Sequence, residues 1–282
     1  MGSTFLLDHL VIAVSDLQQA SADYQALGFN VVVGGQHQHA PTQNALVYFA
    51  DGTYLELIEW TAPAPGEKWY EQLTRQGEGL VDFAFVPSDI GAAIAQAKTR
   101  GVVYRGPIDG SRIKPSGEHV RWQLGWPAFH GLPFLCGDIT PRALRVPEGA
   151  VREHPNQALG ITSIAIRVDD LEVAVGAYQA LVGADSEASW RERHSLPDQG
   201  LEVVSIPLGQ TQLHLVAAAV AEDSPAAQAF RHALRTQGQG VYRLCISATP
   251  AEVPTELCHG ASLRLASEPV SLLDQVSESG QR

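Results

Sequence analysis

The stretch Leu7-Asp8-His9-Leu10-Val11-Ile12-Ala13-Val14-Ser15-Asp16-Leu17 decides the fold, because a strand-like run that holds one histidine leads directly into a helix start. The same pattern returns three times along the chain. Matched on strand register, the position of His9 is taken in turn by Asp82, Ser163 and Arg243, and the last copy is the weakest. His9 and Asp82 lie 73 residues apart, a spacing that is too long for a solenoid repeat and suits a small module of several elements. Four such modules nearly fill the 282 residues.

Each module begins with the same signals for the start and the end of a helix. An aspartate that can cap a helix follows the strand, and a glycine that can end the helix follows one helix length later. The predicted helices span residues 17–27, 90–100 and 171–182, with a poorer fourth helix between 250 and 260. Three short strands follow the first helix, at residues 30–33, 45–50 and 54–60, and Asp51-Gly52 joins the last two as a hairpin. The sequence thus predicts βαβββ modules, with further helices at residues 67–76 and 224–237.

An aperiodic stretch rich in proline, arginine and glutamate separates the modules into two pairs. We expect a first domain at residues 1–145, a linker at 146–156 and a second domain at 157–282. Few residues follow Arg243, so the fourth module is predicted to lack its last strands. The sheet edge left open in this way could be covered by a second copy of the chain, which keeps a homodimer open.

Composition narrows the class of protein. The chain is 45% hydrophobic and 18% charged, which is typical of a globular protein. A net charge of −12 without a basic run argues against nucleic acid or an anionic membrane surface as the main partner, so we expect a small-molecule substrate. No apolar run approaches the roughly 20 residues of a membrane span, and residues 1–5 lack the regions of a signal peptide, so a cytoplasmic location is expected. The three cysteines are expected to be unpaired, and no motif for a nucleotide cofactor appears.

Strand alternation predicts which side chains share a face. His9 points away from Leu10, which is expected to be buried under the helices. The same argument turns Glu56 and Asp82 to the face of His9, and it buries Trp122 so that its neighbours face the open side. The expected polar pocket is therefore lined by His9, Glu56, Asp82, Arg121 and Gln123.

Four ordered stretches resemble the vicinal oxygen chelate superfamily, and more narrowly its glyoxalase-like domain proteins. They are residues 7–17, 34–44, 54–58 and 112–134, which include Gly34-Gly35-Gln36-His37, Tyr54-Leu55-Glu56-Leu57-Ile58 and Pro115-Ser116-Gly117. The resemblance covers residues 5 to about 140 and reaches the second half only at its modules. It implies an α+β fold in which tandem βαβββ modules form curved mixed sheets flanked by helices, around a metal ion.

The resemblance also implies a ligand set. The superfamily's metal positions fall on His9, Glu56, Asp82 and Phe134, and a phenylalanine cannot ligate. In the second half the matching positions hold Ser163, His214 and Arg243, which is no metal set, so that half is expected to be structural.

One histidine and two carboxylates suit Mg, Mn or Zn better than a soft-ligand metal. A bound divalent cation could hold two substrate oxygens and stabilise an enolate, so we expect a lyase or an isomerase that acts on a small oxygenated substrate. In this hypothesis His37 moves a proton and Arg121 stabilises an oxyanion. The remaining expected substrate contacts are Asn44, Gln123 and Phe134.

Three alternatives stay open. A ring-cleaving dioxygenase needs two histidines and one carboxylate around iron, and it ranks lower unless His37 or His39 joins the set. A buried salt bridge between Glu56 and Arg121 would instead leave a metal-free pocket. Such a pocket suits a protein that sequesters an aromatic compound, which Phe134 and the tryptophans favour, or a metal-free enzyme that uses His37 and Arg121.

Overall fold

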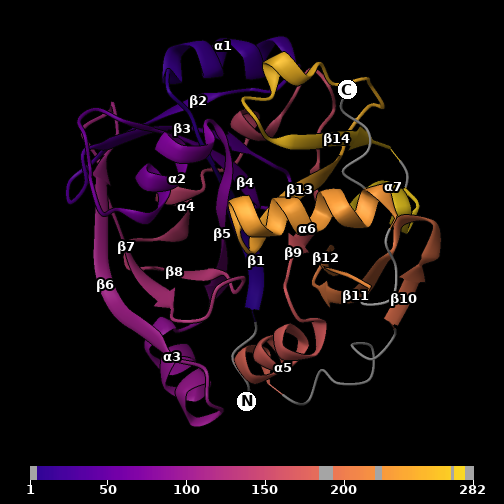
Figure 1. Ribbon diagram of the computed structural model, residues 1–282. Helices are drawn as coiled ribbons and strands as arrows, with labels where there is room; N and C mark the ends of the chain where they lie inside the picture. The colour runs from indigo at the N-terminus through magenta and orange to yellow at the C-terminus, as the bar shows by residue number, and fades with distance from the viewer. Residues whose placement is uncertain (1–4, 184–192, 220–223, 268–269, 277–282) are drawn as a thin grey trace.

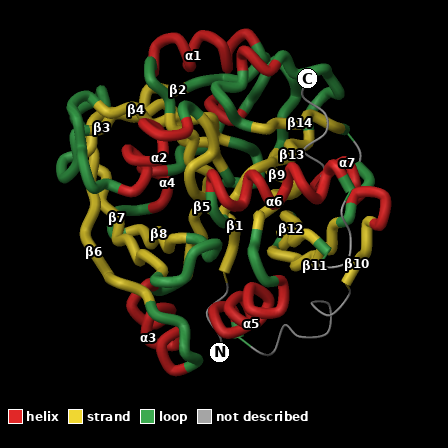
Figure 2. The backbone as a smooth tube through the Cα atoms, in the orientation of Figure 1, coloured by secondary structure: helices red, strands yellow, loops and turns green. Residues whose placement is uncertain are grey.

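The structure is a computed structural model that describes residues 5–183, 193–219, 224–267 and 270–276. Its strands form two sheets that pack against each other (Figures 1 and 2). These curved mixed sheets and their flanking helices confirm the fold class predicted from the sequence.

The first sheet closes into an eight-stranded barrel. Around the barrel the strand order is β1-β4-β3-β2-β6-β7-β8-β5, so each of the first two modules supplies four neighbouring strands. The strands are β1 Phe5–Ala13, β2 Val32–His37, β3 Thr42–Tyr48, β4 Tyr54–Trp60, β5 Gly79–Pro87, β6 Tyr104–Ile113, β7 His119–Pro127 and β8 Phe134–Asp138. The modules meet twice, where β1 pairs with β5 and where β2 pairs with β6. The curved sheet expected for the first two modules is therefore closed into a barrel.

The β2–β6 junction consists of two residue pairs, Gln36 with Ile113 and His37 with Arg112. The strand β2 is irregular at Gly35, whose φ angle is 126°. A Cβ atom on Gly35 would lie 2.0 Å from the carbonyl oxygen of Ile113, so only glycine lets β6 approach this closely. Because β2 continues through Gly34 and Gly35, His37 ends a strand. The prediction of a strand at residues 30–33 followed by a loop was wrong on this point.

The second sheet has six strands and stays open, in the order β10-β11-β12-β9-β13-β14. Its strands are β9 Gly160–Arg167, β10 Arg193–Leu196, β11 Leu201–Leu208, β12 Thr211–Ala218, β13 Gly240–Ser247 and β14 Ser262–Ala266. Within the described residues, β14 is the last strand of the fourth module. The predicted helix between residues 250 and 260 is wrong. A 3-10 turn at Thr255–Leu257 takes its place, because Pro250 and Pro254 each remove a backbone donor.

The helices begin where the capping pattern predicts. Asp16, Asp89 and Asp170 each accept a hydrogen bond from a backbone N–H in the first turn of the helix that follows. Glu67 and Ser224 cap two further helices in the same way. The helices are α1 Leu17–Ala26, α2 Lys68–Gln76, α3 Ile90–Thr99, α4 Arg142–Arg145, α5 Leu171–Val182, α6 Pro225–Gln237 and α7 Leu272–Val276. None of the helices in the described ranges is long and apolar enough to cross a membrane.

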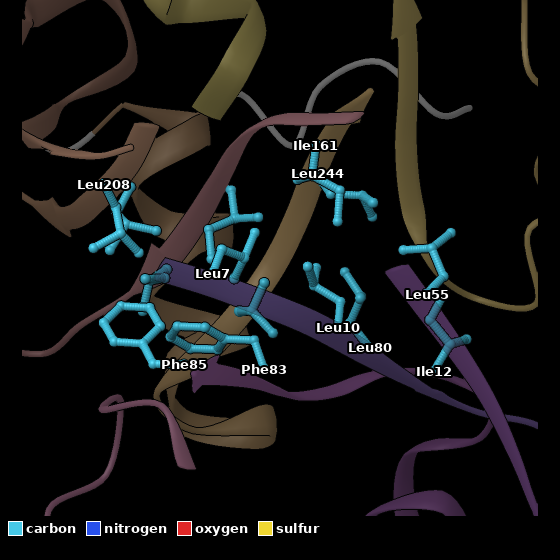
Figure 3. Packing of buried hydrophobic residues seen from close by; sticks show 14 of the residues in the cluster. Leu7, Leu10, Ile12, Leu55, Leu80, Phe83, Phe85, Ile161, Leu208 and Leu244 are labelled. Atoms are coloured by element: carbon cyan, nitrogen blue, oxygen red, sulfur yellow. The ribbon is translucent and has the colours of Figure 1, made fainter. Parts of the chain in front are cut away.

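The main hydrophobic core lies between the two sheets (Figure 3). Leu10 of β1 and Phe83 of β5 pack in one cluster with Ile161 of β9 and Leu244 of β13. Apolar residues from both sheets therefore leave water together, and each sheet covers the outer face of the other.

Replacing Leu10 with alanine should lower the free energy of unfolding by about 2–5 kcal/mol, because it opens a cavity in this shared core. Leu6→Ala on the same strand is the control, since Leu6 is 48% exposed and its truncation should cost only about 0.5 kcal/mol. Urea unfolding followed by circular dichroism measures both. Equal losses in the two variants would contradict a core shared at this position.

Candidate functional site

Alternation along β1 divides its side chains between two environments. Leu10 and Ile12 enter the core between the sheets, whereas Val11 and Ala13 face the inside of the barrel. His9 has the parity of Val11, and it stacks on Tyr54 at a ring distance of 4.4 Å. The sequence correctly separated these two faces, and the face of His9 is the barrel interior.

Aromatic residues fill one part of the interior. Trp126 stacks on Phe134 with ring centroids 5.1 Å apart, and Trp69 from α2 packs against both rings. Gly110 is the register partner of Trp122, and a Cβ atom there would lie 2.4 Å from the indole nitrogen. Glycine at this position thus makes room for the Trp122 ring.

A network of charged side chains lies at the polar end of the interior, around the fully buried Asp8. Arg145, 2% exposed, donates from Nη1 to the Asp8 carboxylate at 2.6 Å and also to Asp138. Arg142 donates to Asp8 at 2.7 Å, and His9 Nδ1 lies 2.8 Å from Asp8 Oδ2. Burial alone would raise the pKa of Asp8, but these cations hold it well below the ordinary value.

Glu56 is held beside this network. Its Oε2 lies 3.4 Å from His9 Nε2, and its Oε1 accepts a hydrogen bond from Asn44 Nδ2 at 2.7 Å. Burial opposes ionisation of Glu56, but the hydrogen bond and charge of His9, with smaller contributions from His37 and Asn44, lower its pKa to about 2. Burial also opposes the charge on His9, yet Asp8 and Glu56 raise its pKa. Glu56 is therefore an ionised carboxylate that His9 and Asn44 hold in place.

His37 completes the polar group. Its Nε2 lies 3.7 Å from Glu56 Oε1, and its Nδ1 lies 2.8 Å from the hydroxyl oxygen of Thr42. Burial is the largest influence on His37 and lowers its pKa, so the neutral imidazole is favoured near pH 7. His37 thus lies beside Glu56 at the end of β2, and no loop has to fold inward to bring it there.

These groups surround a cavity of about 280 Å³. His9, Glu56, His37 and Arg112 form its polar lining. Its walls are mainly aromatic, formed by Tyr54, Trp60, Trp69, Trp122, Trp126 and Phe134. His39 lies on an exposed segment at the same opening. A small molecule in this cavity would meet flat apolar rings and a few polar groups, the usual composition of a ligand site.

Arg112 lines the cavity but was not predicted as a site residue from the sequence. It follows the interior parity of Gly110 on β6 and is 3% exposed. Its pairing with His37 across the barrel closure places both residues at the cavity. The signal was present, since Arg112 lies two positions after Gly110 with only Ser111 between them, but strand parity in β6 is informative only once the interior face is known.

Asp82 does not join His9 and Glu56 at the cavity. Its Oδ2 accepts hydrogen bonds from Lys68 Nζ at 2.8 Å and from the indole N–H of Trp69 at 3.0 Å. It lines a separate polar cleft between the two halves of the molecule. The sequence could not show this, because the tryptophan that binds Asp82 comes from the preceding helix and packs into the barrel.

Arg121 and Gln123 do not line the cavity either, and the predicted facing of β7 was wrong. Arg121 is exposed and lies 3.8 Å from Asp109, and Gln123 donates to the same aspartate at 3.0 Å. The prediction buried Trp122 under helices, but Trp122 is buried inside the barrel, so the alternate residues point outward. The alternative salt bridge between Glu56 and Arg121 is also excluded by this placement.

Of the other two expected substrate contacts, only one lies at the cavity. Phe134 lines the cavity and meets His9 edge to face at 5.3 Å. Asn44 binds Glu56 and is not part of the cavity lining.

The donor set fits a metal poorly at the family's four positions. Asp82 is occupied by Lys68 and Trp69, and Phe134 fills the fourth position with a ring. Across the described ranges, no group of three His, Cys, Asp or Glu side chains is arranged to hold a metal ion.

At the matching positions of the second half, the described side chains are buried and hydrogen-bonded or packed under helices. His214 lies 2.8 Å from Ser205 Oγ and 2.6 Å from Gln275 Oε1 of α7. Phe230 of α6 and Val276 of α7 pack on the concave face of the second sheet, where both helices lie (Figure 1). Ser163 and Arg243 are buried as well. Side chains from α6 and α7 thus occupy the face that remains hollow in the barrel.

Comparisons with known proteins agree with this architecture. A family model described as a glyoxalase-like domain matches residues 7–182. A hypothetical protein from Staphylococcus aureus has a TM-score of 0.65 at 14% identity, over 93% of this chain and 99% of that chain. A mutant of 4-hydroxymandelate synthase from Streptomyces coelicolor has a TM-score of 0.60 at 15% identity, over 87% of this chain and 71% of the other. At these identities the similarity establishes the fold alone. No curated protein matches the sequence.

Replacing Asp8 with asparagine should lower the free energy of unfolding at pH 7 by about 3–5 kcal/mol, because it leaves the Arg145 charge buried without its main partner. Asp109→Asn is the control, since its pair with Arg121 is exposed and is worth about 0–1 kcal/mol. Urea titrations of both variants give the comparison. A similar loss in each would show that the Asp8 network contributes no more than a surface pair.

The same network predicts a pH dependence. The pKa of Asp8 is depressed in the folded protein, so its stabilisation is fully present above about pH 5 and is lost as the pH falls toward the folded value. The parent protein should therefore lose stability between about pH 5 and pH 3 more steeply than Asp8→Asn does. Parallel stability curves for the two proteins over this range would contradict the assignment.

Proposed function

Because the chain belongs to the glyoxalase-like domain family of the vicinal oxygen chelate superfamily, we propose that its barrel is a lyase or isomerase for a small oxygenated substrate. One observation carries the proposal. A neutral His37 and an ionised Glu56 face each other across 3.7 Å at the polar end of an aromatic cavity. A neutral base and a fixed negative charge at one end of an apolar cavity are the groups that can carry out proton transfer from carbon.

His37 is the group that moves the proton. In the tautomer whose Nδ1–H donates to the Thr42 hydroxyl oxygen, Nε2 carries the lone pair that accepts a proton from a carbon next to a substrate carbonyl. The C–H electron pair then forms the C=C bond of an enolate, and the carbonyl oxygen takes the negative charge. Return of the proton to a carbon gives an isomer. Departure of a group from the neighbouring carbon, with the proton of His37, gives a lyase reaction.

The other polar residues support this step. Glu56 stabilises the imidazolium that forms when His37 accepts the proton, since its carboxylate lies on the same side of the ring. Arg112 lines the cavity beside His37 and stabilises the oxyanion, the role that the sequence assigned to Arg121. The aromatic walls limit water around the enolate.

His37→Gln should lower the rate of this proton transfer by about 10²- to 10⁴-fold, because glutamine cannot accept a proton at neutral pH. The measurement is exchange of the C–H next to the carbonyl in deuterated water, followed by nuclear magnetic resonance with a panel of aryl-substituted hydroxy ketones and 2-oxo acids. His119→Gln is the matched control, since His119 is an exposed histidine on β7. Exchange by His37→Gln at the parent rate would contradict the role of His37.

In a rival version of this proposal, His9 and Glu56 bind a divalent metal together with a third ligand. If His37 is the third ligand, the set is the two-histidine, one-carboxylate set of an iron site. We expect protein purified without chelators to hold well below one equivalent of Mg, Mn, Zn or Fe, because Asp82 and Phe134 do not complete a ligand set. Elemental analysis after supplementation with each metal measures this. One tightly bound equivalent that disappears in Glu56→Gln, but not in the outward Glu59→Gln, would establish the metal version instead.

The aromatic lining favours a second candidate function. Four tryptophans in one small cavity suit a protein that sequesters an aromatic compound without changing it. The two functions differ in turnover. Tight binding of compounds that show neither exchange nor conversion would favour sequestration.

A further inference from the structure

Arg112 differs from the other buried arginines of the barrel. Its Nη2 donates to the Tyr48 hydroxyl and to the backbone carbonyl of Arg145, both at 3.3 Å. Its Nε, although buried, has no hydrogen-bond acceptor. By contrast, Arg145 binds both Asp8 and Asp138. In the described part of the chain, no carboxylate lies within 4.0 Å of the Arg112 guanidinium.

A buried guanidinium without an anion is costly, so its position calls for a partner. Glu56, a buried carboxylate that lines the same cavity, is already bound by His9 and Asn44. His37 stands beside Arg112 across the β2–β6 junction and can offer no negative charge. The polar end of the cavity therefore holds one cation more than its carboxylates satisfy.

We propose that Arg112 is the anion receptor of the barrel cavity and that the natural ligand is a flat aromatic compound carrying a carboxylate. The Nε–H of the Arg112 guanidinium is a buried donor without an acceptor, so it can donate a charge-assisted hydrogen bond to a carboxylate oxygen of the ligand. The ring of such a ligand would lie between the tryptophan faces, of which Trp122 is already edge-on to His37 at 5.8 Å. This inference names the substrate class of the proposed enzyme, and it rests on that proposal in taking the cavity as the substrate site.

The test compares two probes of equal shape and different charge, 2-naphthoate and 2-naphthamide. Binding is followed through quenching of tryptophan fluorescence, since four tryptophans line the cavity. The parent protein should bind the carboxylate at least about tenfold more tightly than the amide, as expected for a buried hydrogen bond to a charged group. Arg112→Gln should reduce this ratio to about one, and Arg112→Lys should retain part of it.

Arg105→Gln is the matched control, because Arg105 lies on the same strand but is exposed. It should leave the ratio unchanged. Equal binding of the two probes by the parent, no binding of either at millimolar concentration, or an unchanged ratio in Arg112→Gln would overturn the proposal. If Arg112→Gln does not fold, the parent ratio and its partial retention in Arg112→Lys decide the question.

The same assay separates this inference from the proposed function. His37→Gln should keep the preference for 2-naphthoate while it loses proton exchange. A retained preference in a protein without any turnover would support the anion receptor and refute the enzyme. Turnover of neutral compounds with no preference for the carboxylate would do the reverse.

Discussion

Closure of the barrel between β2 and β6 is the constraint on which the candidate site depends. Two residue pairs make this junction, and Gly35 permits it because no side chain fits against the Ile113 carbonyl. The junction places His37 and Arg112 next to each other on the inner wall. Gly34 has a related role, since a Cβ atom there would lie 2.0 Å from Asn44 Oδ1, and Asn44 in turn holds Glu56. Two adjacent glycines thus govern the position of most polar groups around the cavity.

The charged side chains inside the barrel form a chain of contacts that begins at Asp8. The arginines of α4 satisfy this carboxylate and leave His9 to bridge it to Glu56. Because each member fixes the next, Glu56 stays ionised although it is buried. The aromatic residues begin on the other side of His9, where Phe134 meets its ring edge. The site thereby combines a fixed polar end with an apolar chamber.

Much of the fold could be predicted because its signals are local. Helix caps such as Asp16, the Asp51-Gly52 hairpin and the fourfold repeat each depend on a few neighbouring residues, and all are present in the structure. The shared side of His9 and Glu56 also followed from alternation alone. The role of Gly35 could not be read from its neighbours, because it depends on a contact with a strand about 80 residues later.

Strand alternation could not decide which face of a strand points into the barrel. In a closed barrel packed against another sheet, both faces of a strand can be buried, so an apolar residue such as Trp122 does not identify the outer side. Because of this ambiguity the sequence placed Arg121 at the cavity, where the structure has Arg112. The separation of Asp82 from Glu56 depends on Trp69, whose insertion from α2 has no signature in the strands.

The core between the two sheets joins the half that holds the cavity to the half whose concave face is filled by helices. The second half has lost the polar set at Ser163, His214 and Arg243, yet its apolar face still covers the outside of β1 and β5. A mutation that truncates Ile161 or Leu244 loosens the core behind the strand that carries His9. Duplicated modules of this kind can therefore drift in chemistry while their inward packing stays fixed, and the copy without a cavity persists as the permanent wall of the copy that has one.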